Sequence, residues 1–172
     1  MIPRRARSGW SRTDLVLILA LLVMLALMMV PRMMARLAAV RDARRLEDMQ
    51  RLEAALASYA ERHGHWPAGE ENAERGGWDV SNDGGFLPEL VRDGLLAEAL
   101  HDPLDDEQYQ YRYRVFAPQS HGCGGRGAYY VLGLRAFETR EAAESHRQSF
   151  ACSQRDWAQE LAWSTGAFEP AR

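Results

Sequence analysis

The chain has 172 residues, contains no lysine and has only two cysteines. It also lacks the short motifs by which several enzyme classes are identified: a P-loop, Gly-x-Ser-x-Gly, His-Glu-x-x-His and Cys-x-x-Cys. Without them, the sequence predicts none of the catalytic sites that these motifs mark. Every one of the 21 basic residues is arginine, a bias that a GC-rich genome explains without a functional role. We therefore expect no enzymatic activity.

Positive charge is concentrated near the N-terminus. Nine of the 21 arginines precede residue 46, where only Asp14 and Asp42 are acidic. The remaining chain holds 12 arginines against 22 acids, a formal charge of −10. An acidic body argues against nucleic-acid binding by broad electrostatic attraction. A local DNA contact through Arg112, Arg114 and Arg126 stays open as an alternative.

A long apolar run, Leu15–Val30, follows the basic N-terminal stretch and stops at Pro31. It is a little shorter than the roughly 20 residues that usually span a bilayer. A cleaved signal peptide would need a small-x-small site after the run, and the sequence offers only a poor one. An uncleaved anchor fits, but it leaves Gly9 and Asp14 unexplained. A leader that is cleaved ahead of a retained apolar run explains both residues.

The segment Gly9-Trp10-Ser11-Arg12-Thr13-Asp14 resembles the prepilin-type motif of type IV pilins and type II secretion pseudopilins. In that family a basic leader precedes glycine, an aromatic residue, a small hydroxyl residue, two further residues and an acid. Trp10 and Asp14 replace the usual Phe and Glu, whereas Arg12 and Thr13 stand where family members are generally apolar. The family also has a proline near mature residue 22, and Pro31 is the twenty-second residue counted from Trp10.

The resemblance implies roles for individual residues. Prepilin peptidase would cut between Gly9 and Trp10, and the new N-terminus at Trp10 would be methylated. Asp14 would pair with the N-terminal amine of a neighbouring subunit, since an unpaired carboxylate in hydrocarbon is costly. The alternative for Asp14 is an acid that caps the helix N-terminus. Pro31 removes a helical hydrogen bond and is expected to kink or locally melt the helix.

The resemblance also implies partners and a location. The expected partners are other pilin-like subunits, prepilin peptidase, an inner-membrane platform protein and the membrane itself, with no nucleic acid. The chain would cross the bacterial inner membrane once, with its C-terminal domain in the periplasm.

Apolar residues continue at helical spacing beyond Pro31, which predicts one helix from Ser11 to about Arg62. Its outer half should pack on a sheet through a stripe of apolar residues: Leu37, Val40, Leu46, Met49, Leu52, Leu56 and Tyr59. Gly64 supplies a C-cap, and Pro67 bars continuation. The later succession of a Trp78-Asp79 loop, an Asp102-Pro103 turn and a tyrosine-rich strand is similar to pseudopilin-like proteins.

Two strands are predicted downstream. Tyr109, Tyr111, Tyr113 and Val115 alternate with polar residues, and the segment 128–137 is more apolar, so we expect an antiparallel hairpin. The tyrosines are interpreted as the sheet face that packs on the N-terminal helix, rather than as a ligand platform. In the tail, we expect short helices over 140–148 and from Ser153 through Trp163.

The cysteines, Cys123 and Cys152, lie far downstream of the apolar run. In an exported domain they would form a disulfide. The alternative is two free buried thiols.

One loop is a candidate calcium site. Asp79, Ser81 and Asp83 place oxygen atoms at alternating positions ahead of Gly84, as in the first half of a calcium loop. The expected glutamate at the twelfth position is missing, because Leu90 stands there. An Asx-type turn before a helix is the alternative. No other cofactor is expected.

These observations predict an α+β, pilin-like fold in which a long N-terminal helix packs on a small antiparallel sheet, with a short helical C-terminal tail. The expected parts are a basic leader (residues 1–9), a transmembrane and assembly helix (10–36) and an extracytoplasmic domain (37–172). The predicted function is a structural subunit of a type II secretion or type IV pilus-like filament. The alternative is a single-span, membrane-anchored binding or sensor domain that does not polymerise.

Overall fold

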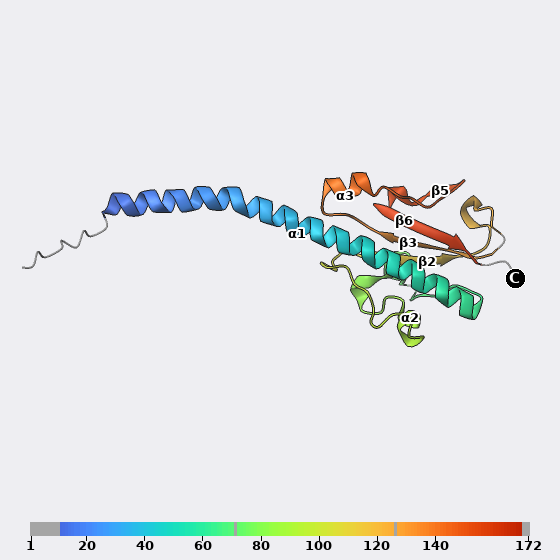
Figure 1. The fold of residues 1–172 in the computed structure, drawn as a ribbon. Coiled ribbons are helices and arrows are strands. Elements are labelled where there is room, and N and C mark those ends of the chain that lie inside the picture. Colours follow the sequence, from blue (N-terminus) through green and yellow to red (C-terminus); the bar gives the residue numbers. More distant parts are fainter. Residues whose placement is uncertain (1–10, 71, 126, 170–172) are drawn as a thin grey trace, which may run out of the picture. The chain divides into compact units, whose positions relative to one another are not determined.

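The computed structural model describes residues 11–70, 72–125 and 127–169. Contacts divide the chain into two compact units, Met1–Leu37 and Ala38–Arg172. The fold is α+β with a pilin-like layout: one long apolar N-terminal helix and a small antiparallel sheet, as the sequence predicts (Figure 1).

The long helix, α1, covers Arg12–His63 without a break, and it passes through Pro31. The helix is therefore not melted at Pro31, and the kink expected there stays a prediction. The helix ends where the sequence predicts. Gly64 adopts φ +75°, and its N–H donates to the Ala60 carbonyl at 2.8 Å. Glycine takes this left-handed conformation without the steric cost that a Cβ would impose.

The main sheet has four antiparallel strands in the order β1 (Asp79–Val80), β2 (Tyr111–Phe116), β3 (Tyr129–Leu134) and β6 (Trp163–Phe168). The predicted hairpin is confirmed as the β2–β3 pair, with Tyr113 opposite Leu132. Side chains on a strand alternate between the two faces. The sheet accordingly carries a separate apolar core on each face.

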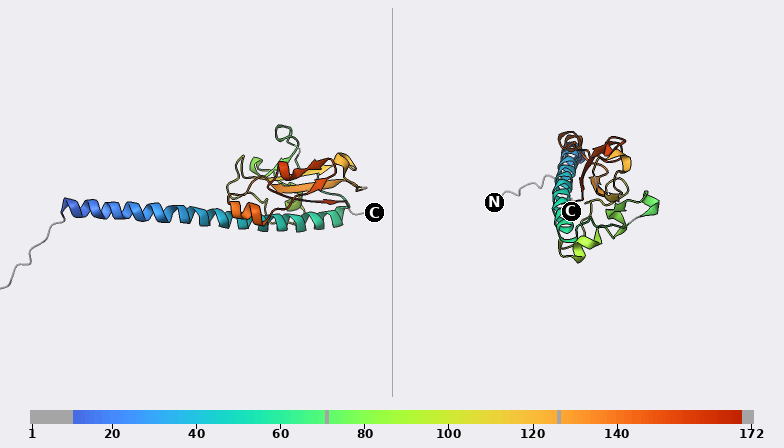
Figure 2. Two further views of the ribbon diagram at one scale, coloured as in Figure 1. Left: turned by 90° about the horizontal axis from the view of Figure 1, so that it is seen from above. Right: turned by 90° about the vertical axis from the view of Figure 1, so that its right-hand side faces the viewer.

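The first core lies between α1 and the sheet (Figures 1 and 2). Tyr111 and Tyr113 of β2 point into it, which confirms the interpretation of these tyrosines as a packing face. The α1 stripe contributes Met49, Leu52, Leu56 and Tyr59, and each fully buried side chain of this kind stabilises the fold by about 1.5–3 kcal/mol. Leu37 and Val40, by contrast, are exposed, so the packed stripe begins later than predicted, at the half-buried Leu46.

The second core covers the opposite face of the sheet. Its buried members are Trp78, Val80, Phe116, Cys123, Tyr129, Val131, Trp157 and Leu161. Several of these come from segments without regular secondary structure, so this face is closed by loops and short strands rather than by a long helix.

The C-terminal tail differs in part from the prediction. Helix α3 (Arg140–Ser145) forms, and the Thr139 hydroxyl caps it by accepting from the Ala142 N–H at 3.2 Å. The predicted helix from Ser153 through Trp163 is wrong. That stretch holds β5 (Arg155–Asp156) and a single 3-10 turn, and it ends at the start of β6. The Asp156 carboxylate caps only that turn, by accepting from the Ala158 N–H at 2.9 Å.

Trp157 and Leu161, which lie four residues apart, are both buried in the second core. The four-residue spacing of these two apolar residues thus belongs to a turn that covers the sheet, and not to a helix. The remaining regular elements are α2 (Pro88–Arg92) and β4 (Ala151–Cys152), which pairs with β5 in a small separate hairpin.

Candidate assembly helix and the charged cluster that anchors it

The start of α1 is held by a reciprocal cap. The Ser11 hydroxyl accepts from the Thr13 N–H at 3.3 Å, and the Asp14 carboxylate accepts from the Ser11 N–H at 3.0 Å. Both bonds cap the N-terminus of the helix, which supports the alternative interpretation of Asp14 as a capping acid. The cap leaves open whether the same carboxylate also pairs with another subunit. Gly9 and Trp10, the predicted cleavage and methylation site, lie outside the described residues.

The apolar segment Leu15–Val30 of α1 is exposed along its whole length. Its length and composition allow it to cross a membrane, and no other helix among the described residues meets this test. At about 1.5 Å per residue it spans roughly 24 Å of the ~30 Å hydrocarbon core. Such a surface needs lipid or another apolar partner, since contiguous exposed apolar surface of this size is rare in soluble proteins.

A cluster of buried charges anchors the second half of α1. The guanidinium of Arg45 is fully buried. It donates to Asp102 at 2.6 and 2.8 Å, to Asp42 at 2.7 Å and to Glu138 at 2.8 Å. Arg41 donates to the same Glu138 carboxylate at 2.7 Å. This Arg45 cluster joins α1 to the turn before β2 and to the segment that follows β3.

The charges of the Arg45 cluster support one another. Burial alone would lower the pKa of Arg45, but hydrogen bonds from its guanidinium to Asp102, Glu138 and Asp42 raise it instead. The hydrogen bond from Arg41, with a further contribution from Arg45, lowers the pKa of Glu138. The pKa shifts of Arg45 and Glu138 both favour the charged form, so ion pairs hold this cluster together.

Two tyrosines contact charged residues of α1. The ring of Tyr109 lies under the Arg45 guanidinium, with 4.9 Å between the guanidinium carbon and the ring centre. Tyr109 is thus a cation–π partner and not part of the first core, contrary to the prediction for all the tyrosines. The Tyr111 hydroxyl donates to the buried Asp48 at 2.9 Å.

Sequence reasoning missed the Arg45 cluster, because it assigned the charged residues of this helix to solvent-facing sides. A partial signal exists in the spacing of Asp42, Arg45 and Asp48, which are three residues apart and so share one side of the helix. The other partners are 57 and 93 residues from Arg45, and nothing local points to them.

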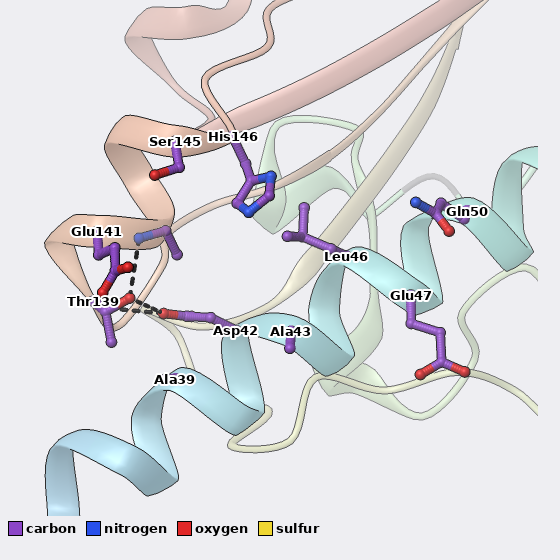
Figure 3. A pocket seen from close by; sticks show the side chains of 11 residues that line it. Ala39, Asp42, Ala43, Leu46, Glu47, Gln50, Thr139, Glu141, Ser145 and His146 are labelled. Carbon is purple, nitrogen blue, oxygen red and sulfur yellow. Dashed lines mark hydrogen bonds between the residues drawn. The ribbon is translucent and has the colours of Figure 1, made fainter.

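A shallow groove of about 460 Å³ lies between α1 and α3 (Figure 3). Figure 3 shows Asp42 and Thr139 pointing toward one another across one end of it. The Asp42 carboxylate accepts from the Thr139 N–H at 2.8 Å, from the Thr139 hydroxyl at 2.7 Å and from the Glu138 N–H at 2.9 Å. With Arg45 added, Asp42 is saturated, so its role here is to hold α3 against α1.

The residues of the candidate calcium loop make hydrogen bonds within the protein. Asp79 is buried, and its Oδ2 accepts from the N–H groups of Glu70 and Leu87, each at 3.1 Å. The Ser81 hydroxyl donates to Asp105 at 2.7 Å and accepts from the Tyr111 N–H at 3.0 Å. The Asp79 Oδ2 and the Ser81 hydroxyl thus have partners within the protein, and calcium binding stays a prediction.

Asp83 in the same loop accepts from the Asn72 amide at 3.3 Å. Within the described ranges, no group of three His, Cys, Asp or Glu side chains is placed to hold a metal ion. Burial raises the pKa of Asp79 to about 7, so its carboxyl is partly protonated at neutral pH. These contacts fit the alternative prediction, a hydrogen-bonded turn ahead of α2.

The predicted disulfide is confirmed. Cys123 and Cys152 are bonded, with 4.8 Å between their Cα atoms. The bond ties the loop after β2 to β4, next to Trp157 in the second core.

Comparison with protein-family models, curated proteins and solved structures gave no match.

Proposed function

We propose that the chain is a structural subunit of a type II secretion or type IV pilus-like filament. One observation carries the proposal: a single helix is fully exposed and apolar over Leu15–Val30, and then packs on an antiparallel sheet from Leu46 to Tyr59. A simple membrane anchor can be joined to its domain by any linker, so it does not need one unbroken helix that serves as both the anchor and a part of the domain. A subunit whose apolar helix holds its domain in a polymer does need such a helix.

The proposed cycle uses the exposed segment twice. The subunit waits in the bacterial inner membrane, with its domain in the periplasm, until prepilin peptidase cuts between Gly9 and Trp10. The platform protein then transfers it to the filament, where neighbouring apolar helices replace lipid. The role is mechanical rather than enzymatic. The disulfide supports this location, because disulfides persist in oxidising compartments such as the periplasm.

Asp14 has a specific part in this proposal. Its carboxylate would pair with the free amine at Trp10 of the adjacent subunit and so set the axial position of each copy. In an apolar filament interior an unpaired carboxylate is strongly disfavoured, so the pair would form in one register only.

We expect Asp14→Asn to reduce filament assembly at least about tenfold, because a lost or unpaired charge of this kind costs more than about 1.4 kcal/mol. Asparagine keeps an acceptor for the Ser11 N–H, so the helix cap survives. The assay compares the sheared filament fraction with the membrane fraction by immunoblot. Ser11→Ala, which weakens only the cap, is the matched control and should still assemble. Normal assembly of Asp14→Asn would refute the pairing role.

The alternative function is a membrane-anchored binding or sensor domain that does not polymerise. The polar residues Arg12 and Thr13 favour it, since they interrupt the start of the helix where pilin-like proteins are generally apolar. On this alternative, Asp14 only caps the helix, and Asp14→Asn changes nothing.

A further inference from the structure

Arg112 lies on the face of the sheet opposite α1. Its neighbours on β2, Tyr111 and Tyr113, point into the first core, so Arg112 points the other way. Its cross-strand partners are Val80 on β1 and Gly133 on β3. Gly133 presents no side chain, and the space above it is taken by Leu161. The aliphatic part of the Arg112 side chain therefore packs on the sheet, and neither residue opposite it has a polar side chain.

The guanidinium of Arg112 is half-buried and has no hydrogen-bond or ion-pair partner among the described residues, and its Nε is buried without an acceptor. The other buried or partly buried arginines among the described residues are compensated: Arg45 and Arg41 by carboxylates, Arg155 by Glu160 at 2.6 Å, Arg75 by Glu107 at 3.5 Å and Arg114 by the Gly76 carbonyl. A buried polar group without a partner is costly, so Arg112 is the exception that needs an explanation.

Two neighbouring arginines, Arg135 and Arg75, disfavour the charged form of Arg112. Arg75 reaches the Glu107 carboxylate at 3.5 Å, and Arg135 donates to the carbonyl oxygen of the same Glu107. Arg135 lies two residues beyond Gly133 and so shares the face of Arg112. Burial, followed by repulsion from Arg135, lowers the pKa of Arg112.

The surrounding acids do not neutralise this group. Glu107 is 82% exposed, and Glu160 is already engaged by Arg155. Two arginines, Arg75 and Arg135, thus lie near a guanidinium that has no hydrogen-bond partner in the part of the chain that the structure describes.

We propose that Arg112, flanked by Arg75 and Arg135, forms a binding site for an oxyanion, a carboxylate or a phosphate group. A guanidinium presents paired N–H donors in a fixed plane that matches two oxygens of such a ligand. The ligand would supply the acceptors and the negative charge that the fold leaves out. The same chemistry is offered by a free inorganic anion and by an acidic side chain of another protein. The site does not depend on filament assembly.

The test uses the full-length chain in detergent micelles, with thermal unfolding measured at constant ionic strength. We expect sodium phosphate, replacing sodium chloride, to raise the melting temperature of the wild-type protein. Arg112→Gln should lose this rise and bind phosphate at least about tenfold more weakly by calorimetry. Arg147→Gln, which changes an exposed arginine elsewhere, is the matched control and should keep the rise.

A second readout separates binding from a structural role. In chloride buffer, Arg112→Gln should melt at or above the wild-type temperature, because it removes an uncompensated charge. A glutamate-rich peptide that binds far more tightly than phosphate would identify an acidic protein segment as the ligand, whereas phosphate binding alone would identify a free anion. A phosphate response that is unchanged in Arg112→Gln, or a large loss of stability in chloride, would overturn the proposal.

Discussion

Replacing Arg45 with alanine is expected to destabilise the domain by about 3–5 kcal/mol, the range found when one partner of a buried ion pair is removed. The substitution leaves the carboxylates of Asp42 and Asp102 buried, at 1% and 4% exposure, with no cation to compensate them. Urea unfolding followed by tryptophan fluorescence measures the change, since buried Trp66 and Trp163 report on the first core. The free energy of unfolding should fall by a large fraction of the 5–15 kcal/mol typical of such domains.

Two comparisons make the Arg45 prediction specific. Arg44→Ala changes an exposed arginine whose nearest carboxylate oxygen, on Asp48, is 3.9 Å away, and it should cost less than about 1 kcal/mol. Combining Arg45→Ala with Asp102→Ala should cost clearly less than the two single changes added together, because each removes the partner of the other. Additive effects, or an Arg45→Ala protein as stable as Arg44→Ala, would contradict the proposed anchoring role.

Removing the disulfide is expected to have the second-largest effect. The bond closes a loop of 29 residues, for which the chain-entropy model gives about 3–4 kcal/mol. Cys152→Ser should therefore lower the melting temperature on the order of 10 °C. The loss should begin in the second core, because Cys123 is buried there and Cys152 packs against it. Differential scanning calorimetry of the oxidised protein and the variant measures the shift.

Ser153→Ala provides the control for the disulfide prediction. The Ser153 hydroxyl donates to the Gly122 carbonyl at 3.0 Å, so it links the same two segments by a single exposed hydrogen bond. This change should cost no more than about 1 kcal/mol. Equal melting temperatures for Cys152→Ser and wild type would show that other contacts alone hold β4 in place.

The ends of α1 and the strand β2 could be predicted from the sequence, because the residues that determine them are close together in the chain. The boundaries of α1 follow from Ser11 and Asp14 at one end and Gly64 at the other, and the alternating Tyr111 and Tyr113 identify β2 and its buried face. In each case a short stretch of chain contains the whole physical cause: a cap, a left-handed glycine or a period of two.

The elements that sequence reasoning missed depend on distant partners. Arg45 looks like an ordinary surface residue until Asp102 and Glu138 are brought to it by the fold. Residues 153–163 have helical spacing, yet Arg155–Asp156 pairs with β4 as strand β5, so only a single turn forms before β6. Similarly, the alternating oxygens of Asp79 and Ser81 resemble a cation loop, but in the fold the Asp79 Oδ2 accepts from two backbone N–H groups and the Ser81 hydroxyl donates to Asp105. Tertiary contacts, not local pattern, decide these positions.

The most direct test of the central claim is the mass of the mature chain. The protein is purified from the membranes of cells that contain an active prepilin peptidase, and its intact mass and N-terminal sequence are determined. The account predicts a chain that begins at Trp10 and keeps Leu15–Val30. A chain that still begins at Met1, or one that has lost the entire apolar segment, would contradict it.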